Sequence, residues 1–138
     1  MLAVILAVSL AGAPAGSYSL VVEGKTIGEF QEMSPGGRDG AGLSLRDGWV
    51  NAGVLEAWWN ELEGSEAPLA TGENSRTGPC PGRKVSVVQR FGHGMRQRQR
   101  SWTIMDACPV EWTVEEQDAA RLVTSLIAFE GTRMGVER

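Results

Sequence analysis

The sequence predicts a mainly-β domain: a β-barrel or β-sandwich with one flanking α-helix. Several short runs rich in β-branched and aromatic residues are separated by turn residues, as in all-β proteins. Glycine accounts for 18 of the 138 residues, which favours many turns and few long helices. A single segment has the apolar spacing of an amphipathic helix, and such a short helix needs a sheet or barrel to cover.

The length and composition indicate one globular domain, which we place at residues 16–138. Hydrophobic residues make up 42% of the chain and charged residues 22%, the balance of a globular rather than a disordered protein. The formal net charge of −4 argues against nucleic acid as the main partner. We find no internal repeat.

The first fifteen residues differ from the rest. Residues 2–10 are almost wholly apolar, and Ala13–Ala15 offers a small-x-small cleavage site. This order is typical of a secretory signal peptide, although no Lys or Arg precedes the apolar run. A membrane-spanning helix needs about 20 apolar residues, more than this run provides. The alternative is that the segment forms a buried first strand or an arm that contacts another subunit. We favour the signal peptide, and therefore an exported protein over assembly in the cytoplasm or in a virion-like particle.

Three strands are expected before the helix. Residues 17–23 alternate weakly and lead into a turn at Gly24–Lys25. Residues 26–33 form a second strand whose imperfect alternation indicates a bulge. Residues 34–42 are rich in glycine and form a loop or hairpin tip, and residues 43–50 form the third strand.

The helix follows directly. Asn51 is a suitable N-cap, because its side chain can accept a hydrogen bond from a first-turn amide. One stripe contains the apolar residues Val54, Leu55, Trp58, Trp59 and Leu62, which we expect to anchor the helix on the barrel. Gly64 ends the predicted helix.

The second half of the chain is predicted to be strands and turns. In order, these are a long loop at residues 65–83, strands at 85–91 and 95–105 joined by a glycine turn at 92–94, a tight corner at 108–112, an acidic turn at 115–118 and a last strand at 122–129. The loop at residues 65–83 exceeds the usual length of a connection, which makes it mobile or functional.

No constellation of residues indicates catalysis. The single histidine, His93, lies between two glycines at a hairpin tip, with no nucleophile or orienting partner placed beside it by the sequence. Two cysteines and one histidine lack the close spacing of metal ligands. We therefore expect neither an enzyme nor a bound cofactor or metal.

An arginine stripe is expected on the second strand of the hairpin. Arg96, Arg98 and Arg100 alternate with Gln97 and Gln99, which places the guanidinium groups on one face and the amides on the other. One reading is a site for a polyanion. The other is a solvated hairpin edge, or a stripe that meets acidic groups of a neighbouring subunit; we favour this second reading because the chain as a whole is acidic.

The two cysteines are predicted to pair. If the hairpin turns near His93, residues whose numbers total about 186 to 188 lie opposite each other, and Cys80 with Cys108 totals 188. Extending the ladder would bring the two within disulfide range. An exported protein would be expected to close this bond. The alternative is a pair of buried free thiols in the cytoplasm.

Several segments, taken in order, resemble one protein family. They are residues 22–24 and 28–34 (a glycine turn followed by Gly-x-Phe-x-Glu), residues 43–48 and 55–59 (a strand with a basic-Gly step, then a helix with Trp), residues 85–88 and 102–104 (a hairpin), residues 106–112 (Asp-Ala-x-Pro-x-x-Trp) and residues 128–131 (Ala-x-Glu-Gly). Together they are similar to the tail-tube proteins of contractile-tailed phages and of related phage-tail-like injection systems. The sequence differs from this family in a shorter hairpin tip at residues 35–42 and a longer loop at residues 65–83.

The resemblance implies self-assembly rather than catalysis. It implies rings, expected to hold about six subunits, stacked into a hollow tube, with further contacts to sheath, baseplate or cargo proteins. If Trp102 and Ile104 face the core, alternation directs their neighbours to the lumen. The lumen-facing candidates are Ser86, Gln97, Gln99, Ser101, Thr103 and Met105. The alternative is an exported β-barrel binding module that presents its long loop or its arginine stripe to a partner.

Overall fold

The computed structural model describes residues 17–36, 41–62, 71–76, 80–91, 98–118 and 120–137. Within these residues the chain forms one helix and eight strands, so the expected mainly-β fold with a flanking helix is confirmed. The strands are β1 (Tyr18–Val22), β2 (Lys25–Pro35), β3 (Gly42–Asn51), β4 (Gly72–Ser75), β5 (Arg83–Phe91), β6 (Arg98–Asp118), β7 (Arg121–Glu130) and β8 (Arg133–Glu137), and the helix is α2 (Ala52–Glu61). The predicted apolar segment at residues 1–15 and the turn at residues 92–94 lie outside the described residues.

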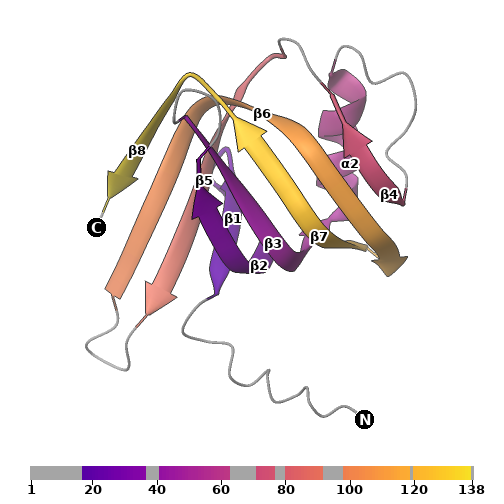
Figure 1. The fold of residues 1–138 in the computed structure, drawn as a ribbon, viewed down its shortest axis with the longest axis horizontal. Coiled ribbons are helices and arrows are strands. Elements are labelled where there is room, and N and C mark those ends of the chain that lie inside the picture. The colour runs from indigo at the N-terminus through magenta and orange to yellow at the C-terminus, as the bar shows by residue number, and fades with distance from the viewer. Residues whose placement is uncertain are drawn as a thin grey trace.

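The strands pair in a closed circuit. Every pairing is antiparallel, and the hydrogen-bonded order is β4-β6-β5-β1-β2-β3-β7. Because β7 also pairs with β6, the circuit β6-β5-β1-β2-β3-β7 returns to β6. These strands enclose the core as a barrel (Figure 1). Each strand of this circuit therefore has a neighbour on both sides. Among the described strands, β4 and β8 each pair on one side only and have an unpaired edge on the other.

Strand β6 serves both halves of the barrel. Its first half pairs with β5 and β8, and its second half with β7 and β4. Strand β6 runs through both predicted features: the turn at residues 115–118 is wrong, and the corner at residues 108–112 is a bend within the strand, with a bulge at Val110. Figure 1 shows it arching from the lower left over the top to the lower right. The bend follows from a left-handed residue at Asp106, with φ +53°, and from an extra, bulged residue at Val110.

The two short edge strands were not predicted. Strand β4 lies inside the segment expected to be a loop, residues 65–83, and pairs with residues 111–114. Strand β8 follows the expected last strand and pairs with residues 101–105. Neither strand has an alternating apolar pattern. Each is held by backbone hydrogen bonds to one edge of β6, and such bonds do not require apolar side chains on one face.

A bulge in β2 was predicted and is present. Leu20 pairs with Gly28 and Val21 with Thr26, so Ile27 is the extra residue. The bulge resets the alternation, and both Ile27 and Phe30 are buried although they lie three residues apart. The core then fills with large apolar side chains from every wall of the barrel. Its largest fully buried members are Trp58, Trp112, Phe129, Leu20, Leu45, Leu55, Ile104 and Ile127.

Gly48 of β3 provides a test of this packing. A Cβ atom there would overlap the carbonyl oxygen of Glu29 and lie 2.6 Å from Cδ2 of Phe30. We expect Gly48→Ala to lower the free energy of unfolding by roughly 1–3 kcal/mol, because backbone must move to admit the methyl group. The matched control is Gly135→Ala in β8, where a Cβ atom meets nothing within 4 Å. Equal denaturant midpoints for the two variants would contradict the close approach of β2 and β3.

Candidate functional site

The helix anchors take the positions expected of them. Asn51 is the N-cap, and its Oδ1 accepts a hydrogen bond from the Val54 amide at 3.0 Å. Leu55, Trp58 and Trp59 are buried, Val54 is half-buried against the core, and Leu62 is buried just after the last helical residue. The Trp58 ring stacks on Phe129 and the Trp59 ring meets Trp112 edge-on, each with centroids 5.9 Å apart. This stripe therefore attaches α2 to β6 and β7.

Cys80 and Cys108 form a disulfide, with Cα atoms 6.2 Å apart. The ladder argument for this pairing was only partly right. Opposite residues of β5 and β6 have numbers that total 189 along most of the hairpin, as in Val87 with Trp102, and a register shift follows at Arg83. Cys80 lies before β5 begins, so the bond joins the segment that leads into β5 to the bend of β6.

The predicted lumen-facing residues share one face of the β5–β6 pair. Trp102 and Ile104 are buried, so alternation directs the residues between them away from the core. Of the candidates, Ser86, Ser101, Thr103 and Met105 are half-buried and Gln99 is exposed, while Gln97 lies outside the described residues. Ser86 lies opposite Thr103, and their hydroxyl oxygens are 2.9 Å apart in a hydrogen bond. We call this the polar outer face; whether it lines a lumen stays a prediction.

The arginine stripe lies on the other face, at the end of the barrel beside the β5–β6 hairpin. Arg98 is opposite Phe91, and Arg100 is opposite Gln89. The Arg100 guanidinium carbon lies 5.9 Å from the ring centroids of both Phe91 and Trp102. Its Nε atom is buried and has no hydrogen-bond partner in the described part of the chain. Arg96 lies outside the described residues.

A hollow of about 530 Å³ opens beside these arginines. We call it the basic hollow, and its lining residues are Phe91, Arg98, Gln99 and Arg100. The volume suits a small ligand or an inserted side chain. The two guanidinium groups and the Phe91 ring in its lining favour a carboxylate or another planar anion.

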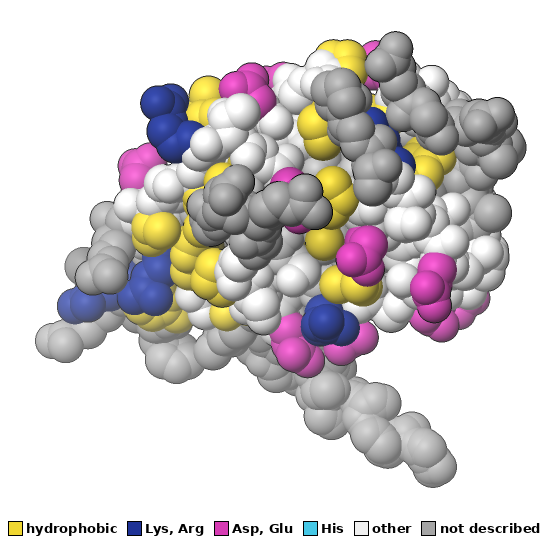
Figure 2. All heavy atoms as spheres, turned by 45° about the horizontal axis from the view of Figure 1, so that its top comes forward, with side chains coloured by type: hydrophobic (Ala, Val, Ile, Leu, Met, Phe, Trp, Pro, Cys, Tyr) yellow, Lys and Arg dark blue, Asp and Glu magenta, His cyan; other side chains and the backbone are white. Residues whose placement is uncertain are grey.

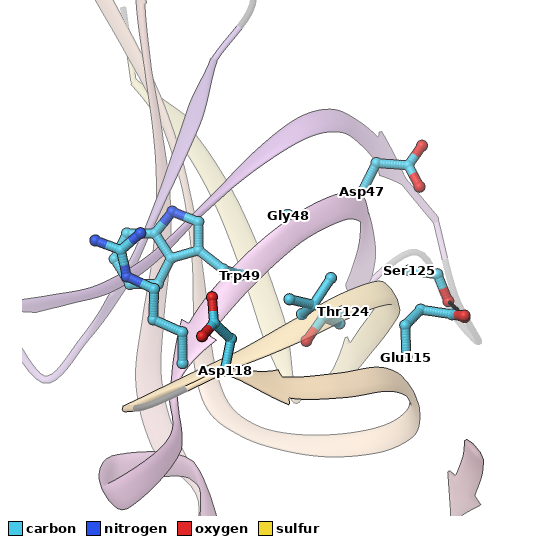
Figure 3. A pocket seen from close by; sticks show the side chains of 9 residues that line it. Asp47, Gly48, Trp49, Glu115, Asp118, Thr124 and Ser125 are labelled. Atoms are coloured by element: carbon cyan, nitrogen blue, oxygen red, sulfur yellow. Dashed lines mark hydrogen bonds between the residues drawn. The ribbon is translucent and has the colours of Figure 1, made fainter. Parts of the chain in front are cut away.

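A second hollow, of about 450 Å³, lies on β3, β6 and β7. Its lining carries three carboxylates, from Asp47, Glu115 and Asp118 (Figure 3). On the same wall the guanidinium carbon of Arg121 lies 4.3 Å from the centroid of the Trp49 ring. We call this the acidic hollow.

Backbone irregularities build the acidic hollow. Glu115 is an extra residue on β6 and Ser125 an extra residue on β7, and the Ser125 hydroxyl donates to Glu115 Oε2 at 2.8 Å. Asp47 has a left-handed backbone, with φ +58°. Bulges re-aim side chains and are often found at functional positions. The sequence showed the acidic run at residues 115–118 but no sign that β3 would bring Asp47 beside it.

Two further findings concern the described part of the chain. No group of three or more His, Cys, Asp or Glu side chains there is arranged to hold a metal ion. The helix that the structure describes is neither long enough nor apolar enough to cross a membrane. We found no family model, curated protein or solved structure that matches this chain.

Proposed function

We propose that this chain is a structural subunit that assembles into rings, and that the rings stack into a hollow tube. The observation that carries the proposal is the polar outer face. Small hydroxyl residues, Ser86, Ser101 and Thr103, occupy the side of the β5–β6 pair that points away from the core. A lumen wall of this kind would let cargo pass, because it offers few apolar groups to which the cargo could adhere.

The same face continues onto the neighbouring strands with small side chains, of which Ser19 is polar and Val21 and Val88 are apolar. Val88 and Ser19 lie beside Ser101 in one row, and Gly135 and Val21 lie beside Thr103 and Ser86 in another. The face thus runs across four adjacent strands, β8, β6, β5 and β1. A wall of four strands with mostly small side chains suits the inner side of a tube subunit.

The open edges of β4 and β8 also support assembly. An unpaired edge offers a row of backbone donors and acceptors to another chain, and monomeric proteins usually protect such edges. Strand β8 also carries Val136, which is 50% exposed. Among the described residues it is the large apolar residue that is exposed to solvent. The order of the tail-tube-like segments from Gly24 to Gly131 points to the same function.

We expect the purified protein to form rings or tubes that are visible by electron microscopy at high concentration and physiological salt. Light scattering under the same conditions should show species of several times the monomer mass of 14.8 kDa. A sample that stayed monomeric over the whole concentration range would overturn the proposal.

A second candidate function rests on the basic hollow. An exported barrel could use Arg98 and Arg100 to hold an anionic partner, with the β-barrel acting as a rigid support. This candidate predicts a monomer that captures a partner, whereas the tube predicts homo-oligomers without one. The light-scattering measurement therefore separates the two functions.

A further inference from the structure

We propose that the acidic end of the β6–β7 hairpin of one copy docks into the basic hollow of the next copy. The acidic end consists of Glu115, Glu116 and Asp118, all exposed. The proposal rests on the proposed function, since it names the contact through which neighbouring subunits would recognise each other. It also assigns a partner to the arginine stripe.

The basic hollow contains a buried hydrogen-bond donor that needs an acceptor. Among the residues that the structure describes, the buried Nε atom of Arg100 has no hydrogen-bond partner, and buried polar groups in native proteins nearly always have one. The rings of Phe91 and Trp102 flank the guanidinium group and limit its movement. Arg98 lies two residue pairs further out on the same face, is exposed and can reach the same ligand. A carboxylate matches these donors, because guanidinium groups bind carboxylates through short, charge-assisted hydrogen bonds.

The acidic end is suited to enter such a hollow. Residues 115–118 are exposed and form the last residues of β6, directly before the connection to β7. Glu115 is held in place by Ser125, which donates to its carboxylate. Glu116 and Asp118 have no ion-pair partner among the described residues, so both carboxylates are available to another chain.

The two surfaces are the two ends of one strand. Strand β6 begins at Arg98, beside the basic hollow, and ends at Asp118. In Figure 1 these ends lie on opposite sides of the molecule. Figure 2 shows Lys and Arg side chains at the lower left of the visible face and Asp and Glu side chains at its lower right, with further side chains of both charges at the lower centre and the upper left. A side-by-side contact would therefore bring unlike charges together.

Because the two surfaces differ, the contact is head-to-tail. After the first contact the pair still has one free hollow, on one copy, and one free acidic end, on the other, so growth continues until a ring closes or a filament forms. Long-range repulsion between chains of net charge −4 opposes association, and local charge complementarity offsets it and sets the orientation of the subunits. The same net charge disfavours a nucleic acid as the occupant.

The test is a charge exchange at exposed positions. Arg98→Glu alone, and Glu116→Lys with Asp118→Lys, should each raise the protein concentration needed for assembly at least about tenfold, because like charges then meet. Combining all three substitutions in one chain should return that concentration to within about threefold of the original, since the charges are exchanged and attraction is restored. The matched control is Glu32→Lys, an exposed glutamate of β2 outside both surfaces, which should assemble as the unmodified protein does.

Melting curves should agree for all variants, because the substituted residues are exposed. If the concentration needed for assembly were the same in every charge-reversal variant, the tube proposal would remain but the proposed contact would be wrong. A combined variant as defective as either parent would overturn it too. An unmodified protein that never assembles would remove both proposals. A single-stranded oligonucleotide could instead bind in a way that depends on Arg98, while Arg98→Glu leaves assembly unchanged. That result would overturn the proposal and show that the hollow binds nucleic acid rather than a second copy.

Discussion

Replacing Trp58 by alanine should lower the free energy of unfolding by roughly 3–5 kcal/mol, the largest loss that we expect from a single side chain in this protein. Trp58 is 1% exposed and stacks on Phe129, so the substitution leaves a large cavity between α2 and the barrel. A helix of 10 residues is too short to persist without this packing. The denaturant midpoint of unfolding, measured with an unchanged m-value, reports the loss.

The helix and Arg83 of β5, which pairs with Glu61 of the helix, provide the controls. Val54→Ala should have a clearly smaller effect, because Val54 is only half-buried. Arg83→Ala should change stability by no more than about 1 kcal/mol, although Arg83 lies over the Trp58 ring and pairs with Glu61, because both partners of that ion pair are partly exposed. If Trp58→Ala left the midpoint unchanged, the stripe would have to face solvent or a partner instead of the barrel.

Removing the disulfide should cost roughly 3–4 kcal/mol in the chain-entropy model, since the bond closes a long loop. Cys80 and Cys108 are 28 positions apart, and the loop between them contains the whole β5–β6 hairpin. We expect the double variant Cys80→Ser, Cys108→Ser to unfold at a lower denaturant concentration. Added reductant should lower the midpoint of the unmodified protein and leave that of the double variant unchanged.

Mass spectrometry without reductant tests whether the bond forms in the cell. Protein from its native compartment should have the mass of the oxidised chain and should resist alkylation after denaturation. A fully reduced mass with two alkylated thiols would show that the compartment is reducing, and it would remove the support that the disulfide lends to export. The tube proposal would remain, because it depends on the strands rather than on the thiols.

The helix and the β5–β6 hairpin could be predicted because their signals are local. The Asn51 cap and the stripe through Trp58 describe one helix without reference to the rest of the chain. The runs on either side of the glycine turn likewise describe a hairpin, although its register differs by at least one residue from the one we expected. Cys80 is off the ladder for a different reason, since β5 begins only at Arg83, and it still lies within reach of Cys108.

The path of β6 could not be predicted in the same way. Pro109 and the acidic run after Trp112 are normally signs of a chain reversal, and they led us to place a corner and a turn. In the barrel, Pro109 lies opposite Phe129, and the bulge at Val110 follows it. A proline is tolerated beside a bulge, where the ladder is already interrupted. Whether such a residue ends a strand depends on the partner strand, which the local sequence does not contain.

The sequence by itself determined the class of fold, the single helix and the alternation that separates Trp102 and Ile104 from the polar outer face, because these depend on the periodicity of neighbouring residues. Only the tertiary structure decided that β4 and β8 add to β6, that the barrel closes through the β6–β7 pairing, and that Asp47 joins Glu115 and Asp118 around one hollow. These features come from backbone hydrogen bonds and bulges between segments that are distant in the chain. Such bonds carry almost no side-chain signature, so they become visible only when both partners are in place.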